Sequence, residues 1–124
     1  MTPFGAELRR LRKAREVTLT QMAASLGVSS AYLSALEHGH RGRPSFSLIQ
    51  RIIAYFNVIW DDAEKLERLA QISDPRVTVD TSGLDPRATE LANRLAQTIG
   101  SLNDDELEEF LVWVKTIQDR RASV

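Results

Sequence analysis

The side chains of this sequence that could carry out chemistry are two histidines and a run of acidic residues. His38 and His40 are separated by one residue, but two imidazoles alone do not complete a metal site, and the sequence contains no cysteine. The acidic residues between 104 and 109 fall in the first turns of an expected helix, where negative charge complements the helix dipole. Because P-loop, GxSxG and dinucleotide-binding motifs are also absent, we predict no enzymatic activity, no cofactor and no metal.

Arginine side chains could instead bind phosphate groups. Residues 1–60 contain eight Lys or Arg and three Asp or Glu, a balance of +5, whereas residues 61–124 contain eight and fourteen, a balance of −6. A polyanion such as DNA would therefore meet the first half of the chain. Arg41 and Arg43 flank Gly42 in an expected loop and are the best phosphate candidates, while the basic run at residues 9–15 has the alternative of being a solvated helix face.

Two short helices precede this loop, and capping residues mark their ends. Thr18 and Gln21 have the spacing of a capping box, and Gly27 can adopt the left-handed conformation that ends a helix. Ser29 is the expected N-cap of the second helix. The residues that face outward near its start are small or carry hydroxyl groups, so that this surface can approach the edges of DNA bases. They are Ser29, Ser30, Ala31, Tyr32 and Ser34.

The segment LGVSSAYLSALEHG, residues 26–39, resembles the helix-turn-helix of lambda-repressor-like proteins, the Cro-type or Xre family. The flanking sequence agrees, because Phe4, Leu8 and Leu11 have the spacing of a first helix and PSFSLIQRIIAYFNV, residues 44–58, resembles the family's fourth helix. The resemblance covers the N-terminal half of the chain only. It implies an all-α, five-helix DNA-binding domain over residues 1–73.

This resemblance also implies roles for individual residues, with the second helix of the motif entering the major groove. Base contacts are expected from Ser30, Ala31, Tyr32, Ser34 and Ala35. Phosphate contacts are expected from the helix starts at Thr18 and Ser29 and from the loop residues His40, Arg41 and Arg43. Arg12 and Glu37 occupy positions where family members often form an ion pair, and two independent surface charges are the alternative.

The remainder of the first half predicts two more helices. One is expected to begin at Ser45 and end at Asn57, and the next to run from Asp61 to Ile72, with Trp60 covering their junction. Residues 74–85 are expected to form an extended linker or a short strand, because polar and apolar side chains alternate from 76 to 80.

Residues 86–121 predict a C-terminal helical hairpin. Asp85 followed by Pro86 marks one helix start, and Asn103 with Glu106 forms a capping box at the other. The two helices carry more apolar surface than a single interface between them would bury, which indicates a dimerisation module. The alternative is that the hairpin folds back onto the N-terminal domain. The expected dimerisation residues are Leu107, Phe110, Leu111, Trp113, Val114 and Ile117.

The length and composition of the chain complete the prediction. With 124 residues, 43% of them hydrophobic, it can bury one modest core and a smaller appended module. Because it lacks a long apolar run and a signal segment, we expect a cytoplasmic protein without a membrane partner. We predict a sequence-specific regulator of transcription that binds double-stranded DNA as a homodimer, acting as a repressor. The alternative is an antitoxin-like or adaptor protein whose acidic C-terminal half binds a separate protein while its N-terminal domain autoregulates.

Overall fold

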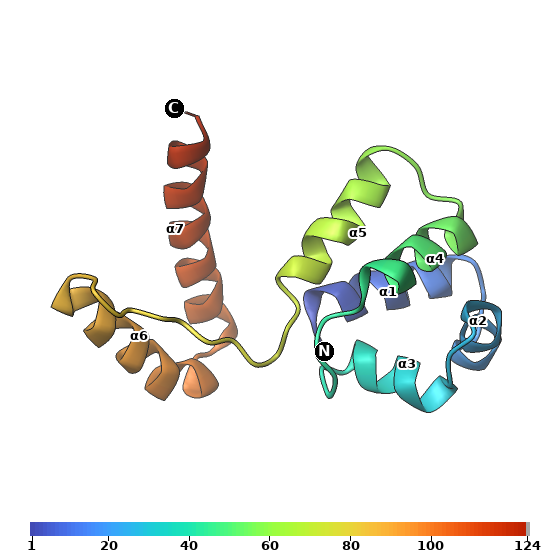
Figure 1. The fold of residues 1–124 in the computed structure, drawn as a ribbon, viewed down its shortest axis with the longest axis horizontal. Coiled ribbons are helices and arrows are strands. Elements are labelled where there is room, and N and C mark those ends of the chain that lie inside the picture. The colour runs from blue at the N-terminus through green and yellow to red at the C-terminus, as the bar shows by residue number, and fades with distance from the viewer. Residues whose placement is uncertain (124) are drawn as a thin grey trace. The chain divides into compact units, whose positions relative to one another are not determined.

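The computed structural model describes residues 1–123, and the regular secondary structure of these residues consists only of helices (Figure 1). In chain order they are α1 Pro3–Ala14, α2 Leu19–Leu26, α3 Ser30–Glu37, α4 Phe46–Phe56, α5 Asp61–Gln71, α6 Pro86–Thr98, the short 3₁₀ helix η1 Ile99–Ser101, and α7 Asp104–Ala122. The chain divides into two compact units, Met1–Val77 and a second unit that begins at Thr78. The all-α prediction is confirmed, and no strand forms between residues 74 and 85.

The first unit has one apolar core to which all five of its helices contribute. α1 packs against α3 and α5, α2 packs against α3 and α4, and α4 packs against α5. Along the longer helices the buried side chains recur three or four residues apart, so each helix turns one face inward. The buried apolar residues are Phe4, Leu8, Met22, Ala23, Leu26, Leu33, Leu36, Leu48, Ile49, Ile52, Phe56, Leu66 and Ala70.

A close approach of two backbones fixes the end of α3 against α1. A Cβ atom at Gly5 would lie 2.2 Å from the carbonyl oxygen of Glu37, so only glycine fits at this position. The backbone N–H of Thr2 also donates to that carbonyl oxygen at 3.3 Å. The last turn of α3 is therefore held by the first turn of α1.

Ser73 anchors the segment that follows α5. Its side chain is buried, its hydroxyl oxygen accepts from the backbone N–H of Phe4 at 2.9 Å, and its hydroxyl donates to the carbonyl of Leu69. These two bonds tie the chain after α5 to the start of α1, which places residues 74–76 in the first unit.

Trp60 does not cover the junction between α4 and α5, as the sequence had suggested. Its side chain is 82% exposed, and its backbone takes the unusual values φ 53° and ψ −123° at the N-cap of α5. Phe56 and Leu66, each 1% exposed, are the nearby residues of α4 and α5 that belong to the apolar core. The sequence pattern could not show the exposure of Trp60. A residue with positive φ does not follow the helical repeat, so its side chain points in a direction that periodicity does not predict.

The second unit contains both expected helices, α6 and α7, and each begins where the sequence predicted. The packed interface expected between the two helices is not present. The side chains of Asp85 and Asn103 cap α6 and α7, and Glu106 completes the second cap. Neither helix has a buried residue, and the two ribbons diverge after η1 (Figure 1). An antiparallel seam needs helix axes about 8–10 Å apart along their length. The apolar faces of both helices consequently remain open in a single chain.

Candidate nucleic-acid interface

α2 and α3 form a helix pair whose connecting turn is fixed by hydrogen bonds. Thr18 Oγ1 accepts from the backbone N–H of Gln21 at 3.1 Å and Gln21 Oε1 accepts from the N–H of Thr18 at 2.9 Å, which confirms the capping box. Gly27 ends α2 with φ 74°, and Arg51 of α4 donates to the carbonyl of Leu26 at 2.5 Å. Packing of α2 on α3 and these bonds together set the orientation of α3.

The first turn of α3 presents small side chains to solvent. The Ser29 hydroxyl accepts from the backbone N–H of Tyr32 at 3.0 Å, which confirms its role as N-cap. Leu33 and Leu36 point into the core, whereas Ser30 and Ala31 are exposed. Ser34 and Ala35 are half-buried on the flank of the helix. Tyr32, the long side chain of this turn, is half-buried, so the fully exposed groups are the hydroxyl of Ser30 and the methyl group of Ala31, which are small enough to approach base edges.

Tyr32 lies differently from the other four candidate base-contact residues. Its ring is half-buried and packs against the core of the first unit. The guanidinium carbon of Arg41 lies 6.0 Å from the ring centroid, within the range of a cation–π contact. One face of the tyrosine thus holds a loop arginine beside α3.

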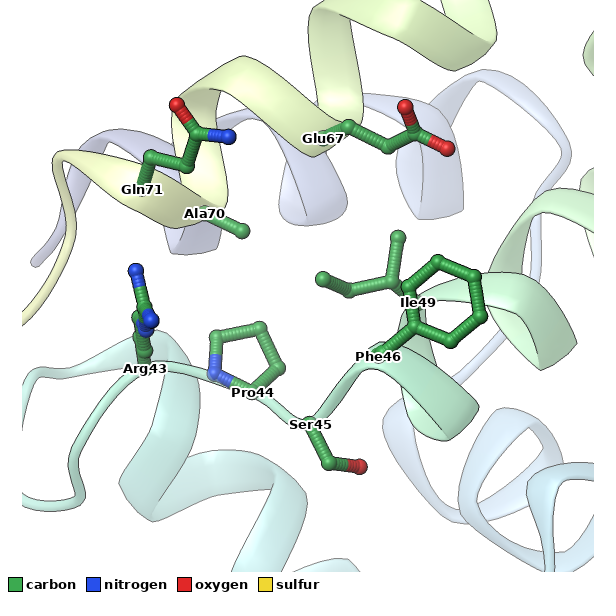
Figure 2. Close-up of a pocket in the computed structure, with 8 residues that line it drawn as sticks. All are labelled: Arg43, Pro44, Ser45, Phe46, Ile49, Glu67, Ala70 and Gln71. Atoms are coloured by element: carbon green, nitrogen blue, oxygen red, sulfur yellow. The ribbon is translucent and has the colours of Figure 1, made fainter.

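The two loop arginines point to different places. Arg41 and His40 are exposed and line a hollow next to the end of α3. Arg43 lines a separate hollow of about 470 Å³ between the loop, α4 and α5, where Figure 2 shows its side chain directed toward Gln71. The structure therefore does not bring Arg41 and Arg43 to one point, although they are two residues apart.

The hydroxyl groups at the starts of α2 and α3 serve as caps, which leaves their protons available. Thr18 and Ser29 each accept a backbone N–H through the hydroxyl oxygen. A hydroxyl that accepts in this way can still donate its own proton to an anion. Both sites also lie at the positive end of a helix dipole.

Arg12 and Glu37 form the ion pair implied by the sequence resemblance. Arg12 Nε and Nη2 donate to the two carboxylate oxygens of Glu37 at 3.4 and 3.3 Å. The side chains are 15% and 2% exposed, so the pair is largely removed from water. The alternative of two independent surface charges does not describe this geometry. The pair joins the C-terminal half of α1 to the last residue of α3.

Other basic residues of α1 have structural partners. Arg10 pairs with Glu7 at 2.5 Å, and Arg15 donates to the carbonyl of Phe56 at 2.6 Å and lies over its ring. The hydrogen bond from Arg10 lowers the pKa of Glu7 below its ordinary value of 4.5, and the charges of Arg10 and Lys65 add to this effect. Much of the basic run at 9–15 thus stabilises the fold.

Sequence reasoning missed two arginines near the motif, Arg51 and Arg76. Arg51 closes the end of α2, and Arg76 lies beside the loop that carries His40 and Arg41. Only the positive charge of these side chains was visible in the sequence, because the segments beside them, at Leu26 and at residues 39–42, are distant in the chain.

The charge asymmetry persists when the chain is divided where the structure divides it. Residues 1–77 contain eleven Lys or Arg and eight Asp or Glu, whereas residues 78–124 contain five and nine.

Within residues 1–123, no helix is long and apolar enough to cross a bilayer, and no three His, Asp or Glu side chains are grouped as metal ligands.

These elements define a class of protein, and comparison with known proteins agrees. A family described as a helix-turn-helix domain matches residues 3–66, and the chain belongs to that family. The predicted helix-turn-helix identity of the N-terminal half is thereby confirmed.

Two curated proteins of Bacillus subtilis (strain 168) are similar to this chain. The uncharacterized HTH-type transcriptional regulator RghRB is 42% identical over 62 residues, 50% of this chain and 45% of that protein. The HTH-type transcriptional repressor RghR is 42% identical over 52 residues, 42% of this chain and 38% of that protein. The matches thus span less than half the length of either relative. A chain of a solved SinR protein/SinI protein complex is 22% identical, with 94% of this chain and 98% of that chain covered, at a TM-score of 0.44, which is too low to establish a shared fold.

Proposed function

We propose that this protein is a sequence-specific regulator of transcription that inserts α3 into the major groove of double-stranded DNA. The observation that carries the proposal is the first turn of α3, which follows two capped helix starts and whose fully exposed side chains, Ser30 and Ala31, are both small. A helix in the major groove must bring its own surface against base edges, which such a turn permits. No catalytic step is part of this proposal.

Readout of the bases would come from few polar atoms. Ser30 and Ser34 would hydrogen-bond to base edges, and Ala31 and Ala35 would contact thymine methyl groups. Tyr32 would add its hydroxyl at the edge of this surface. Phosphate contacts from Thr18, Ser29, His40, Arg41 and Arg43 would supply affinity without sequence preference.

Repression is the proposed mode of action. The relatives are named as a transcriptional regulator and a transcriptional repressor, and each is 42% identical to this chain over the matched residues. A protein bound across a promoter blocks access to it, so binding alone suffices for repression.

We propose that the protein dimerises through its second unit, so that the two copies bind the two half-sites of a DNA operator. Neither α6 nor α7 has a buried residue, and Trp113 is 66% exposed. Because α6 and α7 bury no apolar side chain completely, they gain too little free energy to offset the entropy lost when their backbone is ordered. Another surface is therefore required to cover their apolar faces. A second copy supplies one symmetrically. The proposed contacts are Leu107, Phe110, Leu111, Trp113, Val114 and Ile117.

A matched pair of substitutions tests the DNA-binding surface. Ala31→Glu places a carboxylate on the first turn of α3, and Ala54→Glu places the same charge on the exposed side of α4. We expect Ala31→Glu to abolish specific binding to a duplex selected by the wild-type protein from a random library, and Ala54→Glu to change it little. Equal losses for the two variants would contradict the proposed surface.

The second candidate function, binding of a separate basic protein, has its own supporting observation. Asp105, Glu108 and Glu109 line a hollow on α7 together with Val112 and Trp113, which combines negative charge with apolar surface. A tagged full-length chain that co-purifies with one basic protein, and loses it on Trp113→Ser, would favour an adaptor. Self-association alone would favour the plain regulator.

A further inference from the structure

A second cationic feature lies beside the helix-turn-helix, in the segment that follows α5. Asp74, Pro75 and Arg76 face the loop of residues 39–42 across a hollow of about 440 Å³. The backbone of the two segments is close, because a Cβ atom at Gly39 would lie 4.0 Å from Cβ of Pro75.

The position of this segment is fixed by hydrogen bonds. Buried Ser73 holds its start through the bonds to Phe4 and Leu69. Asp74 Oδ1 then accepts from the backbone N–H of Arg76 at 3.0 Å, which closes a tight turn. Arg76 is therefore carried on an ordered turn next to the loop.

The hollow brings together charges that are far apart in the sequence. Arg41 and Arg76 supply two permanent positive charges, His40 adds an imidazole, and Asp74 is the single carboxylate among the lining residues. The guanidinium of Arg41 also lies over the Tyr32 ring, at 6.0 Å from its centroid, which connects the hollow to the flank of α3. The balance of charge favours an anion, and the carboxylate weakens that preference.

We propose that this hollow receives a phosphate of the DNA backbone, and that Arg76 is a phosphate contact outside the helix-turn-helix. The inference rests on the proposed DNA binding. The two arginines bind one phosphate group from opposite sides, and Tyr32 positions Arg41 for this contact. Asp74 limits the strength of the contact, so the affinity of the wild-type protein is below the maximum that the site allows.

The test uses full-length variants and a labelled duplex of about 30 base pairs, long enough for two half-sites, selected by the wild-type protein from a random library. Arg76→Ala should weaken binding to selected and random duplexes by the same factor, and should reduce the slope of log affinity against log salt by about 0.9 for each site occupied. Arg68→Ala, which removes an exposed arginine of α5, is the matched control and should change neither quantity.

Asp74→Asn gives the opposite prediction. Asparagine keeps the oxygen that accepts from Arg76 but removes the negative charge, so affinity should rise roughly two- to fivefold at low salt. A variant that merely damages the fold cannot produce such a gain.

Three outcomes would overturn the inference. Wild-type binding with no effect of either substitution removes Arg76 from the interface, whereas no wild-type binding at all removes the proposed function itself. If both substitutions instead change only the binding of inorganic phosphate, measured by calorimetry at constant ionic strength, the site takes a small anion and not DNA.

Discussion

The ion pair between Arg12 and Glu37 leads to a quantitative prediction for the stability of the first unit. Glu37 is 2% exposed, and Arg12 is the basic side chain that pairs with it. Arg12→Met keeps an unbranched, flexible side chain, shorter than that of arginine, and leaves a buried carboxylate without its cation. Removing one partner of a buried pair costs about 3–5 kcal/mol.

The structure places the expected loss near the lower end of that range. The nitrogen–oxygen distances of 3.3 and 3.4 Å are long for charge-assisted hydrogen bonds, and Arg12 remains 15% exposed, so that water can reach part of the site. We therefore expect Arg12→Met to reduce the free energy of unfolding by about 3 kcal/mol. For a unit of this size that corresponds to a decrease in melting temperature of roughly 12–24 °C.

Urea denaturation followed by circular dichroism measures this change, with hydrogen exchange of the α3 amides assigning it to the first unit. The double variant Arg12→Met, Glu37→Met removes both charges and should recover most of the stability, because no buried charge is left unpaired. If the double variant is as unstable as Arg12→Met alone, the loss comes from packing, and the reasoning from charge burial is refuted.

Three further predictions concern packing, pH and assembly. Gly5→Ala should destabilise the first unit by about 1–3 kcal/mol because its methyl group meets the Glu37 carbonyl, whereas Gly100→Ala, with open space around it, should leave the melting temperature of that unit unchanged. The pKa of Glu7 is lowered in the folded protein, so its pair with Arg10 stabilises the fold above pH 4.5 and loses this contribution as pH falls further. Glu7→Gln should remove that part of the acid dependence in denaturation curves, and an unchanged curve would contradict the assignment. Phe110→Ala should shift the mass measured by light scattering toward the monomer. The control Phe46→Ala, the same change at an exposed phenylalanine of the first unit, should leave the mass unchanged. Equal behaviour of the two variants would exclude α7 from the dimer interface.

The sequence predicted those parts of the fold that depend on neighbouring residues. The caps at Thr18, Ser29 and Ser45 act within three residues, so their spacing is visible in the chain. Helical periodicity likewise identified Phe4 and Leu8, both buried in α1, because burial follows the 3.6-residue repeat.

The remaining features depend on contacts between distant segments or on single backbone angles. The position of Arg41 over the Tyr32 ring, the direction of Arg43 toward α5 and the position of Arg76 are set by loops whose path has no periodic signal. The exposure of Trp60 follows from one positive φ. The sequence indicated surplus apolar surface on α6 and α7, but it did not show that neither helix buries a residue against the other, because that depends on the angle at which the chain turns between them.

The central claim is that the first turn of α3 and the adjoining loop meet DNA. The most direct measurement is a titration of the ¹⁵N-labelled full-length protein with the selected duplex, observed through backbone amide chemical shifts. We expect saturable shifts that are largest at residues 29–35 and 38–43. Shifts confined to α6 and α7, with α3 unaffected, would contradict it.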